Sequence, residues 1–313
     1  MDGAIDSARP ARPGTSRRSF LFLGAAALAG ASLPIRLYGQ ARITTTDLGG
    51  AVLVQGAGGN VIALPGPDGA LMIDGGRAAN AAALIDAVRS ATKTTRIHTL
   101  INTHWHPDQT GANELVGKAG GIIFAHEKTR TMVSHTVYSA IGFAGRVPPL
   151  SKEARPTKVT RGDGSMEFAG LQIEYGYMPA AHTDGDLFVH IPKLNLLAAG
   201  GVVSAEEWPL LDHRNGAWLG GRVRALERLA KIVKPDTRVV PASGRMMTGA
   251  DIVRHRDMYQ KLFTTMIGYL NMGLGPEDAV ERNPLEEYER EFGDASDFEY
   301  AALRSMMIAY VPD

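Results

Sequence analysis

The chain has 313 residues, with 33 basic and 33 acidic side chains and 44% hydrophobic residues. This length suffices for one large domain or two small ones, and the near-zero net charge gives no indication of nucleic-acid binding. The absence of cysteine excludes disulfide bonds, thiolate metal ligands and cysteine nucleophiles. The sequence shows no internal repeat, heptad pattern or long low-complexity tract.

The N-terminal region has the pattern of an export signal. Paired arginines, Arg17 and Arg18, precede an apolar segment at 22–33 that is rich in alanine and glycine. That segment is shorter than the roughly 20 residues that a membrane span needs. The region resembles a twin-arginine signal peptide, with an N-terminal membrane anchor as the alternative. We therefore expect the twin-arginine translocation machinery to deliver the folded protein to the periplasm, where residues 1–41 are removed and residues 42–313 form the mature chain.

Short strands and one helix are predicted before the first chemical motif. The segments 52–55, 61–64 and 71–73 are apolar and are separated by glycine-rich turns, which is typical of strands. Asp74 directly follows the third segment. Residues 79–91 carry apolar side chains at helical spacing and predict an amphipathic helix.

The stretch THWHPDQTGAN, residues 103–113, contains the chemical motif around which the chain is organised. It follows a predicted strand at 97–101, and a helix is predicted after it. Because side chains alternate along a strand, His104 and His106 point the same way, and Asp108 joins them if the backbone stays extended. Two imidazoles and a carboxylate that converge on one point predict a zinc or iron site. The alternative is a pair of surface histidines in a loop.

A second histidine motif lies further along the chain. The sequence AHTDGD, residues 181–186, stands between two predicted strands. Its His182 completes a set of three imidazoles with His104 and His106, and shells of three histidines occur in catalytic zinc sites with one open position. The alternative for His182 is a histidine in a simple turn.

The two histidine motifs resemble the metal-binding loops of the metallo-β-lactamase superfamily, and the resemblance covers about residues 45–312. It implies the α+β fold of that superfamily, an αββα sandwich with the metals at one edge of its two sheets. It also implies that His104, His106 and His182 hold the first metal. Asp74 resembles an acidic residue that supports the metal loops, with a simple turn aspartate as the alternative.

Three positions depart from the superfamily's pattern for a second metal. Gly201 stands where most relatives carry an aspartate, and Ser243 and Gln109 stand where they carry histidines. Glycine has no ligand atom, and serine and glutamine bind zinc less well than imidazole or carboxylate. Only Asp108 remains of that site, so we expect one tightly held zinc per chain. Four side chains in the loop after Gly201 can partly replace a lost ligand: Glu206, Glu207, Asp212 and His213.

Helices are predicted throughout the C-terminal part. The segments 216–234 and 249–269 have apolar residues at helical spacing, and shorter helices are expected from Gly275 to Tyr310. Residues 249–313 resemble an accessory helical extension of exported relatives. Such an extension can cover the active site or form a homodimer contact.

Two further features concern the walls of a substrate site. Residues 134–156 show little periodicity and contain three prolines, so we expect a flexible loop that forms one wall. Trp208 and Trp218 are expected in the hydrophobic core, and lining of the substrate cleft is the alternative.

These inferences predict an exported zinc-dependent hydrolase. Zinc on three neutral imidazoles lowers the pKa of its bound water to about 7, which provides hydroxide at neutral pH. Asp108 then orients the hydroxide and passes its proton to the leaving group. We expect a small-molecule substrate with a carbonyl or similar electrophile, such as a lactam, lactone, ester or thioester. The alternative is a non-catalytic periplasmic binding or scaffold protein that keeps the fold with a degenerate metal site.

Replacement of both Arg17 and Arg18 by lysine tests the export signal. We expect the precursor to stay in the cytoplasm, because the twin-arginine machinery recognises the arginine pair. The parent chain should accumulate in the periplasm as a shortened protein. Cell fractionation and immunoblotting measure both outcomes, and continued export of the double variant would refute the assignment.

Overall fold

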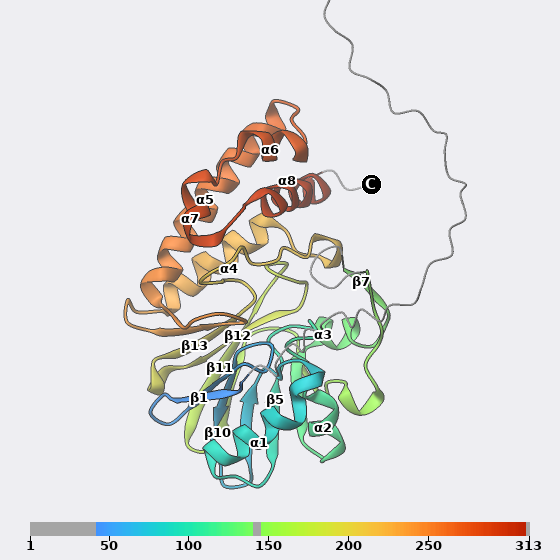
Figure 1. The fold of residues 1–313 in the computed structure, drawn as a ribbon, viewed down its shortest axis with the longest axis vertical. Helices are drawn as coiled ribbons and strands as arrows, with labels where there is room; N and C mark the ends of the chain where they lie inside the picture. The colour runs from blue at the N-terminus through green and yellow to red at the C-terminus, as the bar shows by residue number, and fades with distance from the viewer. Residues whose placement is uncertain (1–41, 140–144, 311–313) are drawn as a thin grey trace, which may run out of the picture. The chain divides into compact units, whose positions relative to one another are not determined.

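Two β-sheets packed face to face, with helices on both outer faces, make up the computed structural model (Figure 1). It describes residues 42–139 and 145–310, which belong to one compact unit. The predicted signal peptide at 1–41 lies outside the described residues.

The first sheet has the strand order β1-β2-β3-β4-β5-β6-β9. Its strands are β1 (Thr44–Asp47), β2 (Val52–Gln55), β3 (Val61–Leu64), β4 (Ala70–Ile73), β5 (Ile97–Ile101), β6 (Ile122–His126) and β9 (Lys158–Thr160). Neighbouring strands are antiparallel from β1 to β4 and parallel from β4 to β9. The parallel part brings the carboxyl ends of β4, β5 and β6 to one edge, where the first histidine motif begins.

The second sheet has the order β10-β11-β12-β13-β14-β15. Its strands are β10 (Gly164–Phe168), β11 (Leu171–Met178), β12 (Asp186–Ile191), β13 (Leu196–Gly200), β14 (Arg238–Pro241) and β15 (Met247–Thr248). Only the β13–β14 pair is parallel among these described strands. The second histidine motif connects β11 to β12.

Alternating side chains explain the layers, because successive residues of a strand point to opposite faces of its sheet. In β3, Ile62 packs between the two sheets, whereas Val61 packs on the outer face with Leu84 of helix α1 (Ala81–Thr92). Likewise, in β12, Leu187 packs between the two sheets and Phe188 packs on the outer face. Both faces of each sheet are therefore apolar, and each sheet needs a cover of helices.

The helices supply that cover. The first sheet is covered by α1 (Ala81–Thr92) and α2 (Asn113–Lys118). The second sheet is covered by α4 (Leu219–Ile232), α5 (Gly249–Asn271) and α8 (Ser296–Tyr310), whose buried residues form one hydrophobic cluster with it. This αββα sandwich with additional C-terminal helices confirms the expected fold class.

The C-terminal region is helical as expected and packs on α4 (Figure 1). Along the chain, α6 (Pro276–Arg282) and α7 (Glu289–Phe292) follow α5 and precede α8. A capping box begins α5: the Thr248 hydroxyl accepts a hydrogen bond from the Asp251 amide, and the Asp251 carboxylate accepts one from the Thr248 amide. Leu219 at the start of α4 donates its amide to the Ser305 hydroxyl of α8.

The prediction of a flexible loop at 134–156 is wrong in part. This segment contains a small antiparallel sheet of β7 (Val137–Ser139) and β8 (Gly145–Val147), and a 3-10 turn at Lys152–Ala154. The two strands have three residues each, which is too short for a periodic pattern to stand out. Val137 of β7 is buried in a small cluster with Trp105 of the first histidine motif, and this contact fixes the hairpin to the rest of the fold. Residues 140–144 lie outside the described residues.

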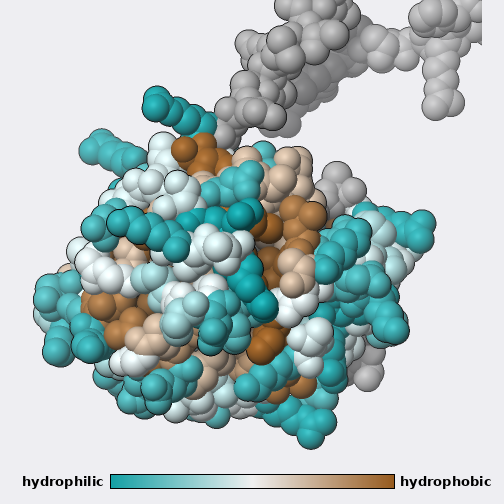
Figure 2. Space-filling model, turned by 90° about the horizontal axis from the view of Figure 1, so that it is seen from below, coloured by the Kyte–Doolittle hydropathy of each residue, from teal (hydrophilic) through white to brown (hydrophobic). Residues whose placement is uncertain are grey.

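The surface gives no test of the expected homodimer, which stays a prediction. The face in Figure 2 carries hydrophilic residues interspersed with smaller hydrophobic groups. The exposed large apolar side chains range from Ile122, which is 37% exposed, to Tyr138, which is 62% exposed. None of the helices in the described ranges is both long enough and apolar enough to cross a membrane.

Candidate metal centre

The first histidine motif is a turn rather than an extended strand end. The amides of Gln109 and Thr110 both donate to the carbonyl of His106, at 2.9 and 3.2 Å. The side-chain amide of Asn102 donates to the Gln109 carbonyl at 3.1 Å and holds the base of this turn. These hydrogen bonds curl the chain after His106, so the backbone does not stay extended and the condition for Asp108 to continue the alternation is not met.

The second histidine motif is held by Asp186, which is 2% exposed. Its carboxylate accepts hydrogen bonds from the amides of His182 and Thr183, at 2.7 and 2.8 Å, and from the Thr183 hydroxyl at 2.7 Å. Burial raises the pKa of Asp186 to about 6, although these hydrogen bonds oppose the rise. The loop is thus fixed by a buried acceptor, and His182 projects from it toward the first motif.

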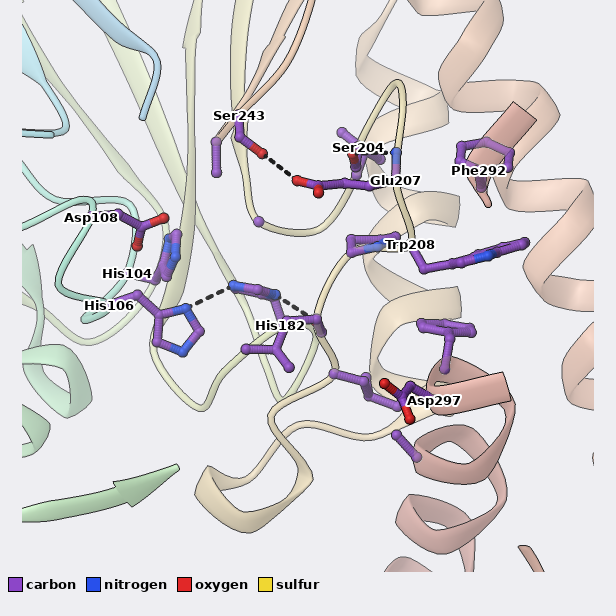
Figure 3. Close-up of a pocket in the computed structure, with 18 of the residues that line it drawn as sticks. His104, His106, Asp108, His182, Ser204, Glu207, Trp208, Ser243, Phe292 and Asp297 are labelled. Carbon is purple, nitrogen blue, oxygen red and sulfur yellow. Dashed lines mark hydrogen bonds between the residues drawn. The ribbon is translucent and has the colours of Figure 1, made fainter. Parts of the chain in front are cut away.

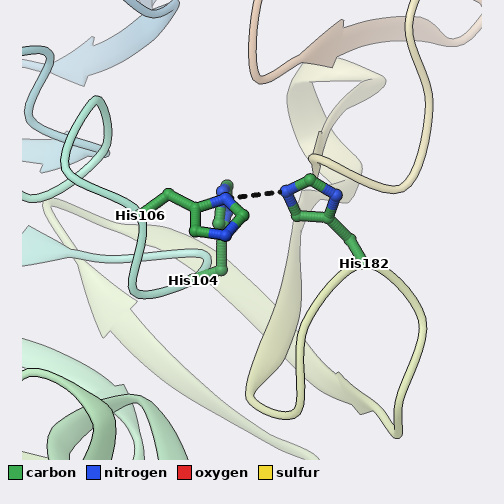
Figure 4. Close-up of side chains that lie close together, drawn as sticks. All are labelled: His104, His106 and His182. Atoms are coloured by element: carbon green, nitrogen blue, oxygen red, sulfur yellow. Dashed lines mark hydrogen bonds between the residues drawn. The ribbon is translucent and has the colours of Figure 1, made fainter. Parts of the chain in front are cut away.

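The structure brings the three predicted histidines together (Figure 4). His104, His106 and His182 are 1%, 2% and 5% exposed, and each offers one ring nitrogen to a cluster in which these atoms lie within 4.8 Å of one another. Nδ1 of His106 lies 3.0 Å from Nε2 of His182. Burial, followed by the charges of neighbouring histidines, holds the pKa of His104 and of His182 well below the usual range.

The other ring nitrogen of each histidine faces an oxygen acceptor. Nδ1 of His182 donates to the Leu210 carbonyl at 2.7 Å, and Nε2 of His106 donates to the Asp212 carboxylate at 3.3 Å. These two bonds place the ring protons on Nδ1 of His182 and Nε2 of His106. The other two nitrogens, Nε2 of His182 and Nδ1 of His106, then face each other with their lone pairs at 3.0 Å. A cation between such lone pairs removes their repulsion, and the donor set therefore fits zinc.

Asp74 supports His104 through Thr103. The Thr103 hydroxyl donates to the Asp74 carboxylate at 2.8 Å and so accepts from Nδ1 of His104, which lies 2.9 Å away. The Thr103 amide also donates to Asp74, at 2.8 Å. Burial raises the pKa of Asp74 to about 8, and its φ of 66° lies in the left-handed region. Asp74 is therefore connected to His104 through one intervening side chain, Thr103, as expected for an acidic residue that supports the metal-binding loop.

A cavity of about 510 Å³ opens from the three histidines (Figure 3). Asp108 lines it on the histidine side, outside the cluster of ligand atoms, and its Oδ1 is buried without a hydrogen-bond partner among the described residues. Across the cavity lie Trp208, Phe292 and Asp297. The cavity thus combines a polar metal-binding end with an aromatic wall.

The C-terminal region builds that aromatic wall. The indole nitrogen of Trp208 donates to the Gly293 carbonyl at 2.8 Å, and its ring lies 4.8 Å from Phe292 and 5.4 Å from Phe298. Trp208 therefore both packs against the core and lines the cavity. Trp218 packs against the core, as expected, and is not among the residues that line the cavity.

Two of the three altered positions, Gly201 and Ser243, line the cavity, whereas Gln109 does not. A Cβ on Gly201 would overlap the imidazole of His182, so no larger side chain fits there while His182 keeps its place. The Ser243 hydroxyl donates to the Glu207 carboxylate at 3.1 Å. The Gln109 side chain is fully buried, and its amide has no hydrogen-bond partner among the described residues.

The four suggested substitute ligands separate into different roles. Glu207 lines the cavity, whereas Glu206 and His213 do not. Asp212 is 2% exposed and contacts the outer nitrogen of His106, so it orients this ligand instead of replacing one. No sequence pattern indicates this pairing, because 106 residues separate the two partners.

The chain belongs to the metallo-beta-lactamase superfamily, whose family model matches residues 54–244. This span contains both histidine motifs. No curated protein sequence matches the chain.

Several solved structures have the same fold. A metallo-beta-lactamase from Pontibacter korlensis is 21% identical, with a TM-score of 0.53, over 70% of this chain and 93% of that one. The stereoselective inverting sec-alkylsulfatase from Pseudomonas sp. is 16% identical, with a TM-score of 0.61. That match covers 84% of this chain, which spans about half, 49%, of the sulfatase. At these identities, the matches establish the fold.

Replacement of Asp212 by alanine tests the orientation of His106. We expect zinc affinity to fall roughly 10- to 100-fold, the usual loss when the partner of a metal-bound histidine is removed. His213→Ala is the neighbouring control and should bind zinc as the parent does. Competition with a chromogenic chelator measures the affinities, and parent-like binding by the Asp212 variant would show that this contact does not support the site.

Proposed function

We propose that this protein is an exported hydrolase that holds a single zinc ion and acts on a small carbonyl-type substrate in the periplasm. The observation that carries the proposal is the set of His104, His106 and His182, each with one nitrogen turned inward and the other facing an oxygen acceptor. Such outer partners are typical of histidines that bind a metal.

The altered positions support one zinc rather than two. Gly201 offers no ligand atom and has no room for one, and Ser243 is engaged with Glu207. Gln109 offers only an amide, which is a poor zinc ligand. A second site would keep Asp108 alone of the superfamily's pattern, so we assign the metal to the three histidines.

Asp108 is the proposed acid–base residue. When bound, zinc supplies Lewis acidity and makes water a nucleophile at neutral pH. Asp108 lines the same end of the cavity, and its buried Oδ1 is not engaged by another described residue. It can therefore take up a proton at Oδ1 and return it to a leaving group. The aromatic wall around Trp208 contacts the rest of the substrate and limits the entry of water.

Lactams, lactones, esters and thioesters are the proposed substrates. Their carbonyl carbon accepts attack by an activated water, and a cavity of about 510 Å³ is the size of a small-molecule site. Phosphodiesters are less well suited, because two metals usually clamp the displaced and attacking oxygens. Fold alone does not choose among the carbonyl compounds.

Sulfate esters are a second candidate class. The structural match to the sec-alkylsulfatase extends over 84% of the chain, compared with 70% for the metallo-beta-lactamase from Pontibacter korlensis. Arg77 also lines the cavity, and among the described residues its guanidinium forms neither an ion pair nor a hydrogen bond. A cation in that position suits an anionic substrate group.

Two substitutions separate metal binding from chemistry. His182→Ala leaves two imidazoles, so zinc and hydrolysis should both be lost. Asp108→Asn keeps the size of the side chain but cannot take up a proton. We expect it to retain about one zinc per chain while turnover falls roughly 100- to 10,000-fold, the usual range for a lost acid–base group.

Elemental analysis measures the zinc, and a panel of chromogenic lactams, lactones, esters and aryl sulfates measures hydrolysis. Loss of zinc together with activity in Asp108→Asn would identify Asp108 as a ligand and refute its acid–base role. A parent chain that binds zinc and hydrolyses nothing in the panel would favour the non-catalytic binding or scaffold protein.

A further inference from the structure

Arg222 is a buried cation that no carboxylate contacts directly, although the charge of Asp186 acts on it. It lies in the first turns of α4, is 0% exposed, and forms no ion pair with any described residue. Burial lowers the pKa of its guanidinium. Burying a charged group costs several kcal/mol unless hydrogen bonds replace its water. Its position therefore depends on what the guanidinium contacts.

Two consecutive carbonyl groups accept from this guanidinium. Nη1 donates to the Pro209 carbonyl at 3.0 Å, and Nη2 donates to the Leu210 carbonyl at 2.6 Å. Because the guanidinium is planar and rigid, a pair of bonds to neighbouring carbonyls fixes the orientation of both peptide groups. The segment 209–210 is thus held in place by α4.

The Leu210 carbonyl is also the outer partner of His182. Nδ1 of His182 donates to it at 2.7 Å, so one oxygen accepts from the guanidinium and from the imidazole. A fixed acceptor at Nδ1 keeps the proton on that nitrogen and turns Nε2 toward His104 and His106. Without it, His182 can rotate or place its proton on Nε2, where a metal ligand must have a lone pair.

The C-terminal helices hold Arg222 from the other side. The guanidinium carbon lies 5.6 Å from the ring centre of Tyr259 in α5 and 5.5 Å from that of Phe298 in α8. Aromatic faces at this distance attract a guanidinium. A continuous set of contacts therefore runs from α5 and α8 through Arg222 and Leu210 to His182.

We infer that Arg222 is a positioning residue for the metal centre, through which the C-terminal helices set the tautomer and orientation of His182. The inference rests on the proposed zinc site. It gives the C-terminal region a role in metal binding that is separate from its role in the cavity wall.

Arg222→Met tests this inference, since methionine fills space between the aromatic rings but donates no hydrogen bond. Arg228→Met is the control on the same helix: Arg228 donates to the Tyr177 carbonyl at 2.7 Å and packs 4.9 Å from the Phe188 ring centre. It differs from Arg222 in its ion pair with Asp163, and it has no hydrogen bond to Leu210. Zinc affinity is measured by chelator competition, and the visible absorption of the cobalt-substituted proteins reports ligand geometry. Circular dichroism establishes that each variant is folded.

Arg222→Met should lose roughly 10- to 100-fold in zinc affinity and change the cobalt spectrum, as expected when support of a metal-bound histidine is removed. Arg228→Met should match the parent in both. Arg222→Lys keeps the charge but lacks the planar fork that binds both carbonyls, so it should lose zinc affinity measurably, although less than the methionine variant.

Parent-like affinity and cobalt spectrum in Arg222→Met would overturn the inference, and so would equal losses in the Arg222 and Arg228 variants. If Arg222→Met does not fold, Arg222→Lys decides, and parent-like affinity in that variant would overturn the inference. A parent chain that binds no zinc would instead refute the proposed function.

Discussion

The burial of three imidazoles against one another is the constraint on which the rest of the site depends. His104, His106 and His182 are almost completely buried, and two of their ring nitrogens lie 3.0 Å apart. Buried polar atoms that face each other without a proton are costly. The surrounding residues direct each outer proton to an oxygen, which leaves the inner nitrogens for a cation.

Two different parts of the chain provide these oxygens. Thr103, held by Asp74 at the end of the first sheet, accepts from His104. Asp212 and the Leu210 carbonyl, both in the loop between β13 and α4, accept from His106 and His182. That loop packs against the C-terminal helices. The proposed role of Arg222 therefore makes the orientation of His182 depend on helices that lie outside residues 54–244, the span matched by the family model.

The layers of the fold could be predicted from the sequence, because long apolar strands and helices carry a clear period. The histidines could be predicted because their motifs stand at strand ends. The hairpin of β7 and β8 was missed because three-residue strands carry almost no pattern. The turn after His106 was missed because its backbone hydrogen bonds are not visible in residue types.

The supporting residues could not be predicted for a different reason. Asp212 meets His106 only after the two sheets pack, and no local spacing connects them. Arg222 lies in a helix with several other arginines, and the sequence alone does not distinguish a buried guanidinium from exposed ones. Such residues act through contacts that are distant in sequence, which single-sequence patterns do not encode.

The metal content of the purified mature protein tests the central claim most directly. After dialysis against metal-free buffer, elemental analysis should find about one zinc per chain, because one three-histidine shell is intact. No bound metal, even after incubation with zinc, would contradict a metal centre at these histidines. Two tightly bound metals would show that oxygen ligands near Asp108 and Glu207 complete a second site.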